Sequence, residues 1–216
     1  LSLPYGFYDD SFGTAVGYVY GVVGRPQPQS ALLTTVMAGT KGSAMGFLIG
    51  RDLRLPWSER LFMDPIASVG YFKVNDLYID GNPDYAESRA GSNDSDAADF
   101  ITGDGWDNYT RLNIKYLLPI GRGRDQIVGV RRIDGGFPIQ TGEWAYSLNP
   151  LDSGKTYLEV RPFYRSQSVE SGNLDEEIRT NGLNVGGFWD NRDFSPNPSR
   201  GFSVRTKVSR DFGALD

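Results

Sequence analysis

Two carboxylates and a guanidinium lie within four consecutive residues near the end of the sequence, at Asp190, Arg192 and Asp193. Neighbouring carboxylates can act as a general acid and a general base when their environments separate their pKa values. The arginine between them favours the charged form of both acids, so we interpret the cluster as structural ion pairing. The chain has no histidine or cysteine, and no serine lies in a G-x-S-x-G turn. We therefore expect no enzyme activity, no catalytic residue and no cofactor.

A second group of acidic side chains lies in a polar stretch from Asp80 to Gly105. Oxygen-rich loops bind hard cations, which makes a calcium site the alternative to a solvated loop. The spacing matches no calcium-loop pattern, and glycine is missing where a tight ligand loop needs it. We expect an extracellular loop without a metal. Its acidic residues are Asp80, Asp84, Glu87, Asp94, Asp96, Asp99 and Asp104.

Charged and apolar side chains alternate along several other segments, most clearly over 109–120, 156–166 and 202–209. A period of two places successive side chains on opposite faces of a β-strand, so each segment has one charged and one apolar face. We expect the charged face to point to a barrel interior and the apolar face to meet lipid. The predicted interior residues are Arg111, Lys115, Glu159, Arg161, Arg205 and Lys207. The predicted lipid-facing residues are Val16, Tyr18, Leu112, Ile114, Val160, Val204 and Val208.

The acidic cluster lies at the end of one such strand, and a second strand begins just beyond it. The residues between them include two prolines, which cannot donate to a ladder, and a glycine that accepts positive φ. The sequence therefore predicts a hairpin, in which Arg192 pairs with Asp190 or with a carboxylate on a neighbouring strand. The hairpin motif comprises Asp190, Arg192, Asp193, Pro196, Pro198, Arg200 and Gly201.

This hairpin resembles the D-x-R-D…P-x-x-G hairpin of the BamA/TamA bacterial surface-antigen family of outer-membrane β-barrels. The resemblance is specific over 181–212 and loose over most of the chain. It implies that the turn is periplasmic and joins strands eight and nine of a barrel of about sixteen strands. It also implies a role in protein assembly or translocation. No periplasmic POTRA repeats of that family are present, and the chain matches the N-terminal part of the barrel.

The order of the predicted strands agrees with this resemblance. Nine long strands begin near residues 1, 12, 30, 43, 61, 106, 155, 179 and 201. We expect polar loops at 80–105 and 167–177 on one side, and short turns on the other, which is the asymmetry of an outer-membrane barrel. We therefore predict an all-β fold in which residues 1–216 form a partial antiparallel transmembrane β-barrel. A non-membrane excursion at about 121–154 interrupts it. Leu1 already lies inside the strand pattern, so we expect a mature, trimmed or partial chain.

The composition fits this fold. Glycine and aromatic residues are abundant, no run approaches eighteen apolar residues, and the mean hydropathy is −0.40. The net charge of −5 argues against nucleic acid as a partner, because phosphates favour basic surfaces. The absence of cysteine fits an oxidising envelope compartment.

Three functions remain open from the sequence. The first is an integral protein of the bacterial cell outer membrane that resembles BamA/TamA assembly or translocation factors. Its partners would be outer-membrane lipids, the remaining barrel strands from the rest of the chain or another chain, and protein clients. The second is a passive pore whose charged interior selects solutes. The third is a soluble β-sandwich binding module.

Overall fold

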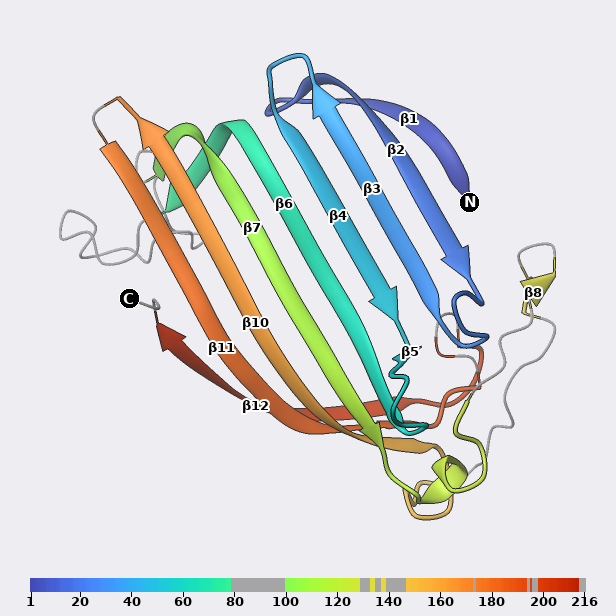
Figure 1. The fold of residues 1–216 in the computed structure, drawn as a ribbon. Helices are drawn as coiled ribbons and strands as arrows, with labels where there is room; N and C mark the ends of the chain where they lie inside the picture. Colours follow the sequence, from blue (N-terminus) through green and yellow to red (C-terminus); the bar gives the residue numbers. More distant parts are fainter. Residues whose placement is uncertain are drawn as a thin grey trace.

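A computed structural model of the chain describes residues 1–78, 100–128, 133–134, 137–138, 147–172, 174–193, 195 and 198–213. Its main element is one antiparallel sheet with the order β1-β2-β3-β4-β6-β7-β10-β11-β12, and β5 pairs with β6 (Figure 1). The predicted all-β antiparallel fold is confirmed. The strands are β1 (Ser2–Asp9), β2 (Gly13–Val23), β3 (Ala31–Gly39), β4 (Ala44–Arg51), β5 (Leu53–Arg54), β6 (Leu61–Tyr78), β7 (Phe100–Leu117), β10 (Lys155–Ser171), β11 (Leu174–Asp190) and β12 (Ser203–Gly213).

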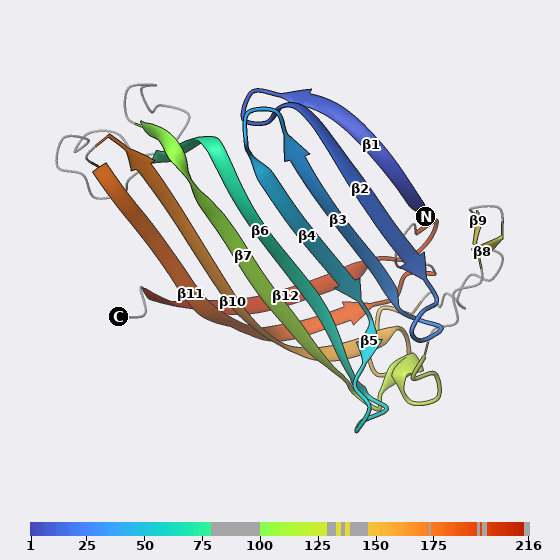
Figure 2. The same cartoon turned by 45° about the horizontal axis from the view of Figure 1, so that its top comes forward.

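The sheet is strongly curved and open. The lower ends of β11 and β12 turn beneath β6 and β7, and β1 lies at the opposite border of the sheet (Figures 1 and 2). Among the described residues, β1 pairs only with β2 and β12 only with β11. Each of these strands therefore has a free edge, and the described part of the chain forms a trough.

Register assigns every side chain to one of two faces. One line of directly opposite residues runs Lys115, Glu159, Gly186, Lys207 across four strands. Charged and polar side chains on this face are buried although the main sheet has no covering layer in the described residues. Side chains bury one another in this way on the concave side of a curved sheet, which we call the inner face. The opposite, outer face exposes large apolar side chains.

The connections alternate between the two ends of the sheet, as the strand order requires. Turns after β2, β4 and β11 lie at one end, together with the segment after β7; the turns after β1, β3 and β10 lie at the other, together with the β6–β7 connection. Two of the predicted loops are shorter than expected. β7 begins at Phe100 rather than near residue 106. β10 continues to Ser171 and β11 begins at Leu174, so most of 167–177 is strand.

Close approach of neighbouring backbone explains why 100–105 forms a strand despite its polar, glycine-containing sequence. A Cβ at Gly103 would collide with the carbonyl of Glu170, and a Cβ at Gly105 with the carbonyl of Ser168. Glycine at these positions lets β10 pass close to β7, which is a recognised use of glycine within strands.

The described residues of the predicted excursion lie outside the main sheet. It includes η3 (Gly121–Gly123) and a separate two-stranded sheet of β8 (Ile133–Asp134) and β9 (Phe137–Pro138). Its flanks are tied to the sheet by hydrogen bonds from the Trp189 indole to the Ser153 carbonyl, at 2.9 Å, and from Arg60 to the Gly123 carbonyl, at 2.8 Å. Within the described residues, no helix has the length and apolar character needed to cross a membrane.

Candidate functional site

The hairpin motif forms a compact set of ion pairs and hydrogen bonds at the end of β11. The Arg192 guanidinium donates to both carboxylate oxygens of Asp190, at 2.7 and 2.8 Å, which is the bidentate geometry of strong arginine–carboxylate pairs. Hydrogen bonding to Asp190 raises the pKa of Arg192 above its ordinary value. The predicted pairing is therefore present, and its carboxylate partner is the one two residues earlier.

The second acid of the motif organises the turn itself. Asp193 Oδ1 accepts the backbone N–H groups of Ser199 and Arg200, at 3.1 and 3.2 Å. Gly201 has φ of 86°, a left-handed conformation that glycine adopts at no steric cost. Pro198 and Arg200 are exposed in this turn, and Pro196 lies outside the described residues. The two acids thus have separate roles, one on the strand end and one in the turn.

The inner face carries a larger polar network that begins at Lys115. Its ammonium lies 2.6 Å from Asp52 Oδ1 and 2.8 Å from Asp64 Oδ2, and its side chain is only 7% exposed. Asp52 lies between β4 and β5 with φ of 51°, and its backbone N–H donates to Asp64 Oδ1 at 2.7 Å. Arg51 lies 4.0 Å from Asp64. The two cations and two carboxylates of this part balance in charge.

The network continues through Asn113 to a second centre at Glu159. The Asn113 amide donates to Asp64 at 3.4 Å and to Glu159 at 3.0 Å. The Glu159 carboxylate also accepts from Arg205 Nε at 2.9 Å and lies 3.7 Å from Arg161. Arg161 Nε in turn donates to Asn113 Oδ1 at 3.3 Å. Two linked clusters on this face therefore join side chains of β4, β6, β7, β10 and β12 and the side chain of Asp52, which lies between β4 and β5.

The other two predicted interior residues lie on the same face but make no ion pair in the described part of the chain. Arg111 is directly opposite Phe163 and lies near the Tyr109 ring, 5.9 Å from its centroid. Lys207 borders a small depression with Glu159, Arg161, Asn184 and Gly186. The structure thus brings together four of the six predicted interior residues, namely Lys115, Glu159, Arg161 and Arg205. Lys207 lies beside them, and Arg111 is on the same face of β7, four residues before Lys115.

Sequence reasoning missed three members of this network: Arg51, Asp52 and Asp64. Asp64 shares one face of β6 with Phe62 and Ile66, so a period of two places it on the inner face, but the adjacent Pro65 weakens the strand pattern in the sequence. Asp52 lies at an irregularity between β4 and β5, where alternation gives no signal. The pairing of Lys115 depends on both, and it is visible only once the strands are placed side by side.

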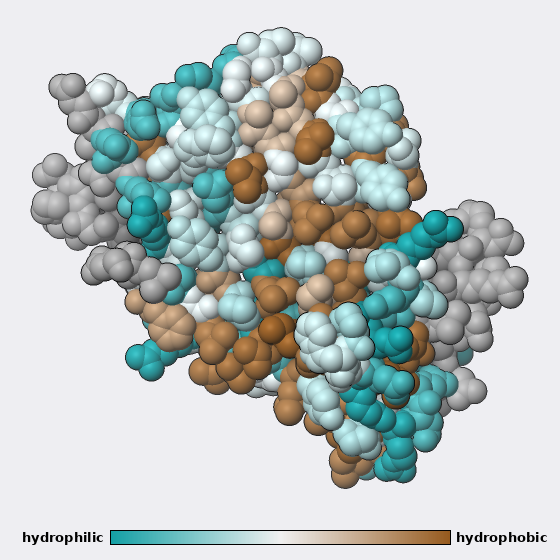
Figure 3. Space-filling model, viewed as in Figure 1, coloured by the Kyte–Doolittle hydropathy of each residue, from teal (hydrophilic) through white to brown (hydrophobic). Residues whose placement is uncertain are grey.

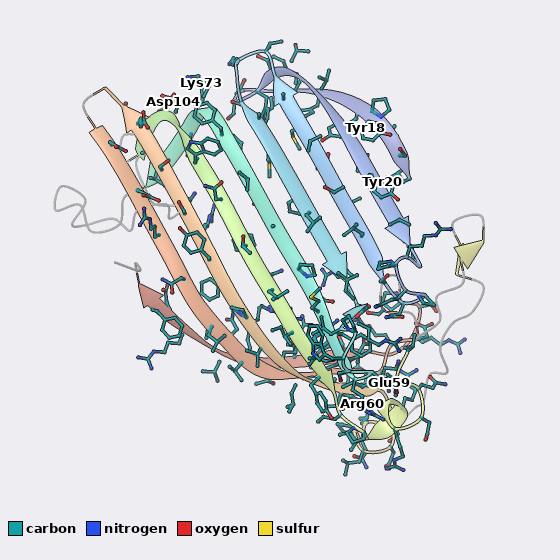
Figure 4. All side chains as sticks on the ribbon, viewed as in Figure 1. Tyr18, Tyr20, Glu59, Arg60, Lys73 and Asp104 are labelled. Atoms are coloured by element: carbon teal, nitrogen blue, oxygen red, sulfur yellow. The ribbon has the colours of Figure 1, made fainter. Side chains whose placement is uncertain are left out.

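No metal centre is found in the described residues, where no group of three His, Cys, Asp or Glu side chains could hold an ion. Most of the acidic stretch, residues 79–99, lies outside the described residues. Asp104 is described, and its carboxylate binds Lys73 at 2.9 Å and accepts a hydrogen bond from Tyr71. Figure 4 shows Lys73 and Asp104 together at one end of the sheet, with Glu59 and Arg60 at the other.

The outer face presents the predicted lipid-facing residues. A line of direct partners, Met63, Ile114, Val160, Val185 and Val208, crosses five strands at one level. Val16, Tyr18 and Val204 are also exposed on this face, and Leu112 is half-buried there. In Figure 3, apolar side chains gather across the middle of the molecule and hydrophilic ones toward the two strand ends.

The chain matches no family model, and the comparisons with curated proteins and with solved structures found no match either.

Proposed function

We propose that the chain forms part of an integral outer-membrane β-barrel, with lipid on its outer face and a polar lumen on its inner face. One observation carries this proposal: a single sheet has an exposed apolar line on one face and a charged network directly behind it. Alternate residues of β7 and β10 belong to opposite sets, such as Ile114 beside Lys115 and Val160 beside Glu159. Soluble proteins rarely expose a contiguous apolar surface of this extent to water, whereas a barrel wall places such a surface against lipid.

The spacing of aromatic residues on β7 supports a membrane-spanning arrangement. Trp106 and Tyr116 are both exposed on the outer face and lie ten residues apart, with Asn108, Thr110, Leu112 and Ile114 between them on that face. Ten residues of strand span about 33 Å, and a tilt of about 40° reduces this to about 25 Å along the membrane normal. That height matches the apolar band of an outer-membrane barrel, which is bordered by aromatic residues at both interfaces.

The two free edges define what else the barrel requires. Unpaired backbone groups facing hydrocarbon cost several kcal/mol each, so the edges of β1 and β12 need partner strands in a membrane. We propose that further strands, from the same polypeptide or another chain, close the barrel there. A β-sandwich is less well supported, because the second sheet in the described residues consists of two strands of two residues.

The role in protein assembly or translocation rests on the hairpin's resemblance to the BamA/TamA family, with protein clients as the partners. The bidentate Asp190–Arg192 pair and the positive φ of Gly201 are compatible with that motif. A passive pore is the alternative that the charged inner face supports. Two measurements separate these functions. In planar bilayers, a passive pore conducts steadily without a client. In cells, depletion of an assembly factor lowers the amounts of other outer-membrane proteins.

The membrane arrangement can be tested with single cysteines, since the chain has none of its own. Cysteines replacing Val160, Tyr164, Phe163 and Arg165 on β10 are labelled with an environment-sensitive fluorophore in lipid vesicles. Labels at Val160 and Tyr164 should emit at shorter wavelength and be quenched by lipid-borne quenchers. Labels at Phe163 and Arg165 should be quenched by aqueous iodide. Equal quenching at all four positions would contradict the proposed faces.

A further inference from the structure

The free edge of β12 carries a lysine whose cross-strand neighbour within the sheet has no side chain. Lys207 lies on the inner face, directly opposite Gly186 of β11. A Cβ at Gly186 would collide with the Thr206 carbonyl, so the β12 backbone occupies the place of that side chain. In the described part of the chain, the Lys207 side chain is exposed and makes no ion pair or hydrogen bond. A directly opposite partner for its ammonium is therefore available only on the free side of β12.

The inner residues on either side of Lys207 are, in contrast, bound to the rest of the sheet. Arg205 Nε lies 2.9 Å from the Glu159 carboxylate. The Ser209 hydroxyl donates to Asn184 Oδ1. Both side chains thus point toward β11 and β10, away from the free edge. The ammonium of Lys207 is the charge that this stretch of the edge presents to another strand.

The outer face of the same strand presents apolar side chains. Val204 and Val208 are 51% and 77% exposed, although they lie opposite the apolar Trp189 and Val185 of β11. In the proposed barrel this face meets lipid, and a neighbouring strand covers the free flank of both valines. Such a strand needs apolar residues on its outer face. Opposite Lys207 on its inner face it needs a carboxylate, because opposite charges stabilise a cross-strand pair and like charges destabilise it.

A second copy of this chain does not fit that description. β1 and β12 run in the same direction, because an even number of antiparallel pairings separates them in the sheet. Copies inserted the same way into a membrane would therefore pair through parallel strands, whereas every described pairing of the main sheet is antiparallel. A second β12 would also bring Arg205 and Lys207 beside Lys207. The inner residues Leu3, Tyr5 and Phe7 of a second β1 would offer no charge.

We propose that the partner of β12 is an antiparallel β-strand with a carboxylate directly opposite Lys207 and apolar residues at the two adjoining outer positions. Directly opposite side chains lie about 4.5–5.5 Å apart at Cβ, so Asp or Glu reaches the ammonium there. The proposal rests on the outer-membrane barrel proposed above, which requires a strand at this edge. It adds the register position and the charge by which the correct strand is recognised, because a basic residue at that position would be repelled.

The test is the binding of labelled strand peptides to the protein in detergent micelles, measured by fluorescence anisotropy at constant ionic strength. Each peptide has about ten residues, the length of a membrane-spanning strand. Valine fills its outer positions and threonine its inner ones, except that the central inner residue is glutamate or glutamine. The glutamate peptide should bind about fivefold more tightly than the glutamine peptide, equivalent to about 1 kcal/mol.

Two variants and a modified peptide assign this preference to its cause. Lys207→Gln should abolish the preference for glutamate, because the ammonium is removed. Arg210→Gln is the matched control, since it removes the same charge from the same strand but Arg210 lies opposite Leu183 on the outer face; the preference should remain. A glutamate peptide that is N-methylated along the edge facing β12 keeps its charge but loses its backbone donors, and should not bind. Heat-modifiable gel mobility shows whether each variant is folded.

Several results would overturn the proposal. Equal binding of the two peptides to the wild type, or a preference that survives in Lys207→Gln, would exclude the carboxylate opposite Lys207. Binding of the N-methylated peptide, or no binding of any peptide, would exclude strand addition at this edge. Loss of peptide binding as the protein concentration rises would identify a second copy as the occupant instead. Each of these results would leave the fluorophore pattern on β10, and with it the barrel proposal, intact.

Discussion

Replacing Lys115 by methionine tests whether water is excluded from the ion pairs that Lys115 makes on the inner face. The variant keeps the aliphatic stem but leaves Asp52 and Asp64 without the ammonium that lies 2.6 and 2.8 Å from them. Removing one partner of a buried ion pair costs about 3–5 kcal/mol, because an uncompensated charge remains. Asp64 retains hydrogen bonds from the Asp52 N–H and from Asn113, so we expect the lower end, about 3 kcal/mol.

The assay is urea unfolding in lipid vesicles, followed by tryptophan fluorescence, with the slope compared between variants so that only the free energy of unfolding is interpreted. Lys41→Met is the matched control, because the Lys41 side chain is exposed and its ammonium donates to the backbone carbonyl of Asp10 rather than to a carboxylate. It should change stability by no more than about 0.5 kcal/mol. Adding Asp64→Asn to Lys115→Met should recover part of the loss, since one of the two unpaired charges is then removed. If Lys115→Met is as mild as Lys41→Met, water reaches the network and the inner face is not the buried surface described above.

Three further predictions follow the same logic. Val185→Arg, in the apolar line, should lower the free energy of unfolding in vesicles by more than Val204→Arg, beside Trp189 near the strand end, because the cost of arginine falls from about 2–4 kcal/mol at the midplane to about 0–1 kcal/mol near the interfaces; equal costs would contradict the assigned membrane level. Gly201→Val should cost more than about 1 kcal/mol because of the positive φ, and should slow assembly measured by heat-modifiable gel mobility; wild-type behaviour would show that this conformation is not required. A double-mutant cycle of Asp190→Asn with Arg192→Gln should give a coupling of about 1 kcal/mol or less for this partly hydrated pair, and a coupling of zero would leave the turn alone to set the register.

Alternation predicted the parts of this fold in which each side chain meets a different environment from its neighbours. The outer positions Val160 and Ile114 and the inner positions Glu159 and Lys115 needed only the period of two. Alternation was insufficient at Phe100–Gly105, where the decisive factor is the approach of the β10 backbone to two glycines. It was also insufficient at Ser166–Glu177, where polar side chains on both faces conceal a regular hairpin.

The partners within the inner network lay beyond sequence reasoning for a related reason. Asp64 and Lys115 are 51 positions apart in the chain, and only strand pairing brings them together. Charge alternation identifies which side of the sheet each belongs to, but contact also requires the register between β6 and β7. That register is set by pairs such as Phe62 with Lys115 and Asp64 with Asn113.

The two free edges of the sheet differ in their capacity to accept another strand. Leu1 and Gly21 exchange backbone hydrogen bonds, so in antiparallel pairing the odd residues of β1 hydrogen-bond to β2. The backbone N–H and C=O groups of the even residues point away from β2, toward the free edge. These residues are Ser2, Pro4, Gly6 and Tyr8. Proline at the second outward position removes a donor and blunts that edge.

On β12 the bond from the Asn191 N–H to the Phe202 carbonyl assigns the even residues to β11. The outward ladder is then Ser203, Arg205, Lys207, Ser209 and Asp211, an unbroken series of donors and acceptors. The two edges are therefore unequal: β12 offers an unbroken ladder to a partner strand, whereas the ladder of β1 lacks one donor at Pro4. In the absence of a partner strand, self-association of this chain should begin at β12 rather than at β1, and the positive charges of Arg205 and Lys207 should limit its strength.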